Sequence, residues 1–443
     1  MKVKQAKVAG ASSSRSGKRE QDAPATFNPT LTPKLRFPEF RDAMGWEECE
    51  LRTIADPVSD RADNKDDNNI LTLSAEQGLV LQSEYFGKQI AGTNAERYLR
   101  IQQDDFVYND RVTKASAYGT IKRLKKHPHG IVSPIYKCFR FKDGELPSFW
   151  EWYFEAGAHE AQLRSLANEG ARAGRFNVSI DRFLATSVWA PTSDSAEQHK
   201  IASCLSSLDD LIAAESQKLD ALKTHKQGLM QQLFPREGET RPRLRFPEFR
   251  NAGEWKEEKL GGVGDVLMCK RIFASETNDV SGVPFYKIGT LGGKPDAYID
   301  KDLFDDYRSR YKYPRVGEVL ITCSGTVGKC LPYDGRDAYY QDSNIVWIDN
   351  PTQAVSNEFL VRILTNVNWG KLNSTTITRI YGPDLKGLLI RFPKDHAEQH
   401  RIASCLSSLD DLITAQSDKL ETLKTHKKGL MQQLFPAPEE VGA

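Results

Sequence analysis

Two stretches of the sequence concentrate side chains that can hydrogen-bond to nucleic acid. The first contains Asn109, Arg111, Lys114, Ser116, Tyr118, Lys122 and Arg123. The second contains Ser324, Thr326, Lys329, Ser343 and Asn344. Arg and Lys can bond to guanine edges or phosphates, Asn can bond to adenine, and hydroxyl groups can bond to phosphate oxygens. These residue types therefore predict contacts with DNA.

Two later clusters have the same chemistry, one at Arg172 and Arg175 and the other at Thr376 and Arg379. Any one of these residues taken alone is also compatible with an ordinary solvated surface. Their grouping at matching places in two parts of the chain favours DNA binding.

Segments that resemble catalytic or metal-binding motifs depart from them at the essential residues. The glycines of Gly325–Cys330 are too closely spaced for a phosphate-binding loop, and Cys330 stands where Ser or Thr would hold magnesium. Ser133–Tyr136 (SPIY) only faintly resembles the Asn-Pro-Pro-Tyr of adenine methyltransferases. No Cys-x-x-Cys pair occurs. We therefore expect no catalytic residue, no metal site and no cofactor in this chain.

The candidate residues fall in two variable regions, roughly Glu47 to Ser195 and Lys256 to Asp395. Short apolar runs rich in β-branched and aromatic residues, such as Phe106–Tyr108 and Val319–Ile321, predict strands. Helices are expected around 148–167 and 356–368. Each region is therefore predicted to be a compact α+β domain.

The two variable regions share weak landmarks. Asp105–Tyr108 corresponds to Glu318–Ile321, and Gly119 is interpreted as the counterpart of Gly325. The loop between these landmarks is longer in the first region. A common scaffold with altered loops is a usual way for one fold to change its ligand.

Each variable region is followed by a nearly identical segment. Residues 196–235 and 397–436 differ only by conservative or polar exchanges, such as Glu215 against Gln416, at a constant offset of 201 from Pro235 to Pro436. A second short repeat precedes each variable region, at 33–46 and 242–255. Repetition of the flanks beside divergence of the middle indicates one shared geometry and two different recognition tasks.

The repeated segments predict long helices with a heptad seam, because apolar residues recur at alternating steps of four and three. The seam comprises Ile201, Leu205, Leu208, Ile212, Leu219, Leu222 and Leu229, and then Ile402, Leu406, Leu409, Ile413, Leu420, Leu423 and Leu430. Glu215 and Lys226, with Gln416 and Lys427 in the second copy, interrupt it. We predict that the two helices pair antiparallel about a pseudo-twofold axis. Packing of each helix only on its own domain is the alternative.

Composition sets broad limits on the protein. Lys and Arg (61) balance Asp and Glu (60), which argues against an unstructured basic DNA coat. The seven scattered cysteines fit a reducing compartment, and no apolar run approaches membrane-spanning length, so a cytoplasmic location is expected. Residues 1–30 predict a disordered tail, with weak non-specific DNA contact as the alternative.

The repeats resemble those of the specificity (S) subunit of type I restriction–modification enzymes. The motif E-Q-x-x-I-A occurs at Glu197–Ala202 and Glu398–Ala403, followed by L-x-x-L-D at Leu205–Asp209 and Leu406–Asp410. Both helices end in G-L-M-Q-Q-L-F-P. The resemblance covers nearly the whole chain except the N-terminal tail, and the long N-terminal extension departs from the family.

This resemblance implies a domain order along the chain. A first target-recognition domain would span 31–195 and a second 237–395. Spacer helices would span 196–236 and 396–436, and a tail 437–443. Each recognition domain would read one half of an asymmetric, bipartite site in double-stranded DNA, without catalysis by this chain.

The resemblance also implies partners. The spacer helices would dock two methyltransferase (modification) subunits, and motor/nuclease (restriction) subunits would join them. S-adenosylmethionine, ATP and magnesium would bind those partners. Two other functions remain open at this point: a self-sufficient methyltransferase or nuclease with an unrecognised site, and a coiled-coil scaffold without DNA affinity.

Overall fold

The computed structural model describes residues 30–62, 69–87, 95–113, 116–167, 178–192, 195–372 and 379–436. The chain divides into two compact units. Unit 1 comprises Met1–Asp210 and Lys424–Ala443, and unit 2 comprises Leu211–Leu423. Each unit therefore contains part of both long helices. The predicted N-terminal tail, apart from Thr30, and the tail 437–443 lie outside the described residues.

Unit 1 combines three small sheets with short helices. The sheet orders are β1-β2-β11, β3-β10-β7-β8 and β5-β4-β9-β6. The strands are β1 (Thr30–Leu31), β2 (Trp46–Glu50), β3 (Ala55–Pro57), β4 (Ile70–Ser74), β5 (Gly78–Leu81), β6 (Leu99–Gln102), β7 (Phe106–Asn109), β8 (Thr120–Arg123), β9 (His129–Val132), β10 (Lys137–Phe141) and β11 (Ser187–Ala190). The helices are α1 (Leu51–Ile54), α2 (Gln82–Phe86), α3 (Pro147–Glu155), α4 (Glu160–Ala167) and α5 (Ile180–Leu184).

Unit 2 has the sheets β12-β20, β13-β19-β16-β17 and β15-β14-β18. Its strands are β12 (Lys256–Lys259), β13 (Asp265–Leu267), β14 (Val283–Tyr286), β15 (Tyr298–Ile299), β16 (Val319–Thr322), β17 (Cys330–Pro332), β18 (Tyr339–Tyr340), β19 (Ile345–Asp349) and β20 (Leu389–Phe392). Its short helices are α7 (Leu260–Val263), α8 (Lys301–Arg310), α9 (Asn357–Thr365) and α10 (Gly382–Gly387). Both units therefore mix helices and sheets, as predicted.

The predicted helix over 148–167 is interrupted. Gly157 adopts a left-handed φ of +76°, which a helix cannot accommodate, and α3 and α4 lie on either side of it. The helix predicted over 356–368 is α9, whose first turn is capped by the Ser356 hydroxyl accepting from the Phe359 amide.

One sheet has the same strand order in both units. The order β3-β10-β7-β8 of unit 1 corresponds to β13-β19-β16-β17 of unit 2, and all these neighbours are antiparallel. Its central strand β16 is buried at every residue, which explains the run Val-Leu-Ile-Thr. The two variable regions therefore share this part of their scaffold.

The strand register corrects one predicted equivalence. Asn109 pairs with Thr120 across β7 and β8, and the amide of Thr322 donates to the carbonyl of Lys329 at the corresponding place in unit 2. Gly119 therefore matches Gly328, one residue before Lys329, and the predicted match with Gly325 is wrong. The prediction rested on the likeness of the triplets Gly119–Ile121 and Gly325–Val327, which occupy different places in their hairpins.

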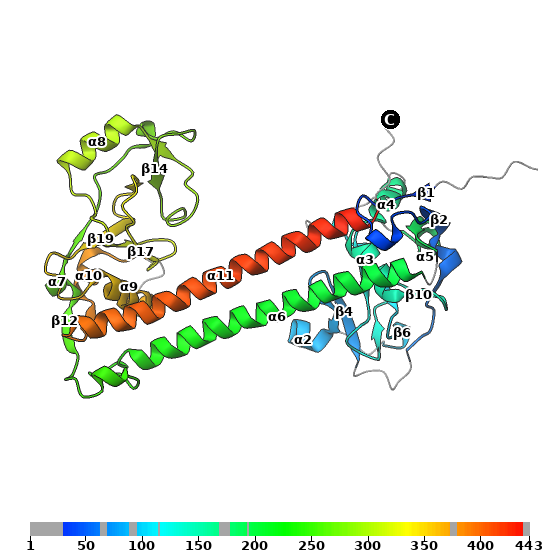
Figure 1. Cartoon of the computed structure of the whole chain (residues 1–443), viewed down its shortest axis with the longest axis horizontal. Coiled ribbons are helices and arrows are strands. Elements are labelled where there is room, and N and C mark those ends of the chain that lie inside the picture. Colours follow the sequence, from blue (N-terminus) through cyan, green and yellow to red (C-terminus); the bar gives the residue numbers. More distant parts are fainter. Residues whose placement is uncertain are drawn as a thin grey trace, which may run out of the picture. The chain divides into compact units, whose positions relative to one another are not determined.

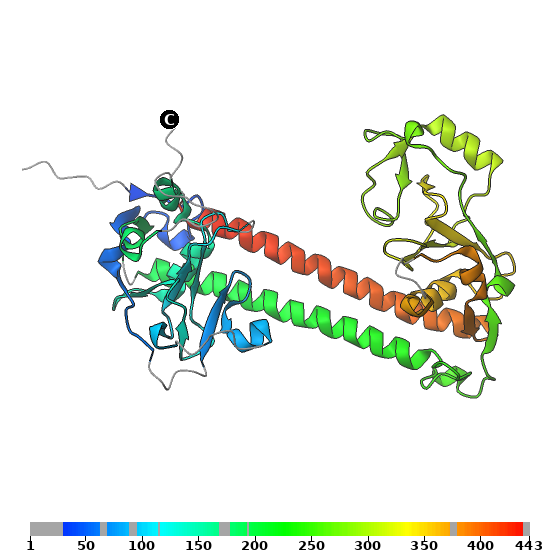
Figure 2. The same cartoon turned by 180° about the vertical axis from the view of Figure 1, so that it is seen from behind.

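The repeated segments form α6 (Ala196–Leu233) and α11 (His396–Leu434), which run side by side in both views (Figures 1 and 2). Within unit 2, Glu215 contacts Gln416 while Lys226, further along α6, contacts Asp410, earlier on α11. The two helices are therefore antiparallel there. In both helices the seam positions are buried or half-buried, and Ile201, Leu205, Ile402 and Leu406 are almost fully buried.

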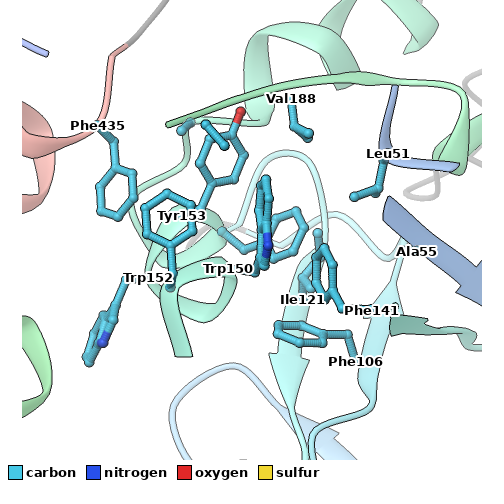
Figure 3. Packing of buried hydrophobic residues seen from close by; sticks show 14 of the residues in the cluster. Leu51, Ala55, Phe106, Ile121, Phe141, Trp150, Trp152, Tyr153, Val188 and Phe435 are labelled. Carbon is cyan, nitrogen blue, oxygen red and sulfur yellow. The ribbon is translucent and has the colours of Figure 1, made fainter. Parts of the chain in front are cut away.

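The end of each helix completes the core of the unit that contains it. In unit 1, Phe435 lies 6.0 Å from Trp46 and 5.6 Å from Phe149 between ring centroids. Figure 3 shows Phe435 beside Tyr153 among the buried aromatic residues. In unit 2, Phe234 takes the same place.

Ring-centroid distances in unit 2 match those in unit 1. Phe234 lies 5.9 Å from Trp255 and 5.5 Å from Phe359. The Leu-Phe pairs of the repeated ends, Leu233–Phe234 and Leu434–Phe435, are thus core residues. Each one serves the unit in which its helix terminates.

The repeated short motifs anchor the helix starts. Arg36 donates from Nε and Nη2 to both carboxylate oxygens of Glu197, at 2.7 and 2.6 Å. Arg245 makes the same two bonds to Glu398, at 2.6 and 2.7 Å. Both carboxylates are buried, and a bidentate pair with an arginine offsets the cost of burying them. The Glu of each E-Q motif therefore has a structural role.

None of the helices among the described residues is long and apolar enough to cross a membrane.

Candidate nucleic-acid interface

In unit 2 the candidate residues lie at one end of the sheet β13-β19-β16-β17. The loop 323–329 joins β16 to β17 and carries Ser324, Thr326 and Lys329. The turn that contains Ser343 and Asn344 leads into β19, the neighbour of β16. Gly328 makes the tight loop possible, since it has a φ of +81° and a Cβ there would lie 2.1 Å from the Trp369 ring.

Four of the predicted residues meet in a single hydrogen-bonded cluster. The Ser324 hydroxyl donates to Oδ1 of Asn344 at 2.7 Å. Arg379 donates from Nη2 to the carbonyl and hydroxyl oxygens of Ser343, at 3.3 and 3.2 Å. Arg379 and Ser324 are also partners in a β-bridge. Three separate segments thus converge, and we call Ser324, Ser343, Asn344 and Arg379 the unit 2 cluster.

The unit 2 cluster is bordered by residues that the sequence did not single out. The Arg379 guanidinium lies 5.6 Å from the centroid of the Tyr381 ring, and Tyr381 is 60% exposed. Arg271 is bound to Asp342 through its Nε at 2.8 Å, and Phe273 is 60% exposed. Exposed aromatic rings beside arginines can stack on bases or sugars. The proximity of Tyr381 to Arg379 in the sequence was the available signal.

Lys329 and Thr326 are held in place by hydrogen bonds within unit 2. The Lys329 ammonium donates to the carbonyl oxygen of Leu291, and the Thr326 carbonyl accepts from the Thr322 hydroxyl. The side chains of both residues nevertheless lie on an exposed loop. Thr376 lies outside the described residues.

In unit 1 the corresponding hairpin joins β7 to β8. Oδ1 of Asn109 accepts from the backbone amide of Arg111 at 3.2 Å, which starts the loop with an Asx turn. Arg111 is exposed, and the Ser116 hydroxyl donates to the carbonyl of Gly119. Lys114 lies outside the described residues, as do Arg172 and Arg175.

The remaining unit 1 candidates are tied to neighbouring helices. Nε of Arg164 donates to the Tyr118 hydroxyl at 2.9 Å. Lys122 pairs with Glu155, and Arg123 pairs with Glu151 at 3.3 Å, both acids lying on α3. The charges of Lys122 and Arg123 are thus partly neutralised within unit 1, whereas Arg111 is open to solvent.

Two cysteines bracket the loop 323–329 but are poor nucleophiles. Burial raises the pKa of Cys323 to about 11 and that of Cys330 to about 12. A thiol must lose its proton to react, so both are inert near neutral pH. Among the described residues no group of three His, Cys, Asp or Glu side chains is arranged to hold a metal ion.

Each variable region of the chain contains the shared sheet with different surface loops, and a nearly identical long helix follows each region. Residues 252–425 match the model of the type I restriction modification DNA specificity domain. The resemblance seen in the sequence is therefore confirmed.

Two similar proteins are described as type I restriction enzyme specificity subunits. A putative type I restriction enzyme specificity subunit from Haemophilus influenzae is 45% identical over 162 residues, which cover 37% of this chain and 42% of that protein. The MjaVIII specificity subunit of Methanocaldococcus jannaschii is 25% identical over 275 residues, or 58% of this chain and 63% of that protein. The chain thus spans less than two thirds of either relative.

Solved structures share the fold. The S subunit of a type I restriction–modification system from M. genitalium has a TM-score of 0.55 at 13% identity, covering 92% of this chain and 100% of that one. A chain from a type I R-M system studied for complex assembly has a TM-score of 0.54 at 18% identity, covering 88% and 97%.

Proposed function

We propose that this chain is the non-catalytic DNA specificity subunit of a type I restriction–modification complex. Its two recognition domains each read one half of a bipartite, asymmetric site in double-stranded DNA. The observation that carries the proposal is the sheet repeated in both units with divergent loops at matching places. One scaffold with two sets of loops suits two different half-sites.

The unit 2 cluster supports base reading by the second domain. Arg379 and Asn344 present the donors and acceptors that read guanine and adenine edges, and the hydrogen bonds to Ser343 and Ser324 fix their orientation. A side chain held in one conformation loses less entropy on binding, which favours its use in recognition. Tyr381 adds an apolar contact beside the arginine.

The helices α6 and α11 support a spacing role. A helix of 38 residues is about 57 Å long at ~1.5 Å per residue, a length comparable to about 17 base pairs. A paired helix is much stiffer than a loop, so it can fix the distance between two half-sites.

The outer faces of the helices support the docking of two methyltransferase subunits. Leu211 on α6 and its repeat equivalent Leu412 on α11 are 43% and 55% exposed. Identical exposed apolar residues in both copies suit two copies of one partner. Restriction subunits would join the complex, and S-adenosylmethionine, ATP and magnesium would bind the partner subunits.

DNase I footprinting of the complex with purified methyltransferase subunits tests the proposal. We expect two protected half-sites separated by a fixed gap. The proposal fails if protection is continuous, limited to one half-site or independent of sequence. Methylation profiling of the host genome would give the sequence of the site independently.

A further inference from the structure

The two helices meet at one point where a residue contacts its own repeat equivalent. Glu215 and Gln416 occupy the same position in the two repeats, 201 residues apart. Nε2 of Gln416 donates to the Glu215 carboxylate and, at 3.0 Å, to the Glu215 carbonyl oxygen. Both residues are buried, with exposed fractions of 9% and 6%.

This position is also the only buried difference between the repeats. The segments 196–235 and 397–436 differ at seven pairs of positions, and six of these pairs are exposed in both copies. Elsewhere the seam is identical. Nothing else in the seam can therefore distinguish one repeat from the other.

An identical seam is self-complementary. Lys427 pairs with Asp209 in unit 1, and the equivalent residues Lys226 and Asp410 pair in unit 2. Phe435 and Phe234 fill equivalent places in the two cores. An α6 helix could therefore make the same contacts with α6 of a second copy of the chain as it makes with α11.

The contact at Glu215 and Gln416 distinguishes pairing of α6 with α6 from pairing of α6 with α11. Pairing of α6 with α6 would bring two Glu215 carboxylates together at a buried position, where like charges repel strongly. Pairing of α6 with α11 places a carboxylate against an amide donor. Lys419 adds a hydrogen bond to Glu215, and the causes that lower the pKa of Glu215 are, in order, the bonds from Lys419 and Gln416.

We propose that the Glu215–Gln416 contact selects heterotypic pairing of α6 with α11 and excludes pairing of α6 with α6 from a second copy of this chain. A polar pair at one seam position is a known way to specify partner choice in coiled coils. Each helix pair then comprises one helix that follows a first domain and one helix that follows a second domain. This selection goes beyond the proposed function and does not depend on DNA.

Two single substitutions and their mixture test the proposal on the full chain. Gln416→Glu gives a chain with two acids at the contact, and Glu215→Gln gives a chain with two amides. When the two variants are mixed, an acid can face an amide at this contact only if helices of two different chains pair. Differently tagged chains are unfolded in denaturant, refolded together, and one tag is captured while the other is quantified.

We expect the mixture of the two variants to give at least tenfold more cross-capture than a mixture of two tagged wild-type chains. The reversed double variant E215Q/Q416E is the matched control. It should behave as wild type, because Lys218 stands at the same spacing from position 215 as Lys419 does from 416. Cross-capture in the variant mixture no higher than in the wild-type mixture would overturn the proposal.

A second measurement covers the case in which refolding is poor. Thermal unfolding of the Q416E chain should show a lower Tm than wild type at neutral pH. The deficit should shrink in mild acid, where one of the facing carboxyls takes up a proton. An unchanged Tm at neutral pH contradicts selection by charge. Neither readout involves DNA or partner subunits, so failure here leaves the proposed function untouched.

Discussion

Lys427 of α11 donates a hydrogen bond to the Asp209 carboxylate of α6, and its ammonium also lies 4.5 Å from the centroid of the Trp152 ring. The repeat-equivalent Lys226 binds Asp410, which accepts in addition from Arg362. The two lysines that interrupt the heptad seam are therefore partnered in both units. A third residue from the variable region, Trp152 or Arg362, joins each pair.

Reversing one charge of the Lys427–Asp209 pair should destabilise the protein, whereas exchanging the two charges should not. K427D would place two carboxylates together and should lower the free energy of unfolding by roughly 1–2 kcal/mol, as like charges at short range do. The double reversal D209K/K427D should recover most of the loss. Urea unfolding of the single variants and the double variant gives the coupling energy. No recovery in the double variant would show that the ion pair does not stabilise the helix contact.

Arg379 should determine specificity at one half-site. R379A should weaken binding of the complex by roughly 1–3 kcal/mol, or about 5- to 150-fold in Kd, and relax base preference in the half-site read by unit 2. The half-site read by unit 1 should keep its preference. Selection from a randomised DNA library reads both halves at once. K394A, which removes an exposed cation outside the cluster, is the control.

Alanine substitutions of Arg111 and of Lys122 should change the salt dependence of DNA binding by different amounts. R111A removes a solvent-exposed charge and should reduce the salt slope of DNA binding by about one counterion. K122A removes a charge already paired with Glu155, so it should change the slope less. Fluorescence anisotropy over a salt series measures both slopes. A larger effect from K122A would mean that the Glu155 pair opens on DNA.

His159 should make the stability of unit 1 depend on pH. Its side chain is buried, Nδ1 has no hydrogen-bond partner, and burial lowers its pKa to about 3. The unfolded chain takes up a proton near pH 6.5 that the folded chain does not. Stability should therefore fall as the pH drops, by roughly 1–2 kcal/mol between about pH 6.5 and about pH 5.

Removal of the His159 imidazole should make the free energy of unfolding depend less on pH between about pH 6.5 and about pH 5. H159F keeps an aromatic ring against Phe154, whose centroid lies 5.1 Å from that of His159. Urea unfolding at several pH values, with exposed H426Q as the control, compares the slopes. The same slope in H159F and wild type would assign the acid sensitivity to other groups.

The helix pair should set the gap between half-sites. Because α6 and α11 are antiparallel, a seven-residue insertion after Asp220 needs a matching heptad opposite it in α11 to keep the seam in register. The pair then lengthens by about 10.5 Å, equivalent to about three base pairs. Methylation profiling should show unchanged half-sites and a longer gap. An unchanged gap with retained methylation would refute the spacing role.

Local features were predictable because their signals are local. The heptad steps located both helices, and apolar runs located β7 and β16. The unit 2 cluster was harder, since Ser343 and Arg379 lie far apart in the sequence and meet only through the sheet. Their residue types indicated that both could contact DNA. Their hydrogen bonds depend on the paths of the loops, which residue types do not encode.

Two features had no usable signal in the sequence. The acids that neutralise Lys122 and Arg123 come from α3, and nothing in the basic cluster indicates which helix will face it. Phe435 looked like the end of a helix, but its place beside Trp46 depends on a contact between residues almost 400 positions apart in the sequence. Both depend on contacts between distant parts of the chain.

The position of Phe435 in the core with Trp46 has a consequence for biosynthesis. Trp46 leaves the ribosome early, but Phe435 follows only after nearly all of the described chain has been translated. Unit 2 begins its core with Phe234 and completes it with Ile402 and Leu406 of α11, so its first aromatic residues wait for a shorter stretch of translation than Trp46 does. Unit 1 must expose its unfinished aromatic core until the end of α11 has emerged, which makes it the part most exposed to aggregation and to chaperones.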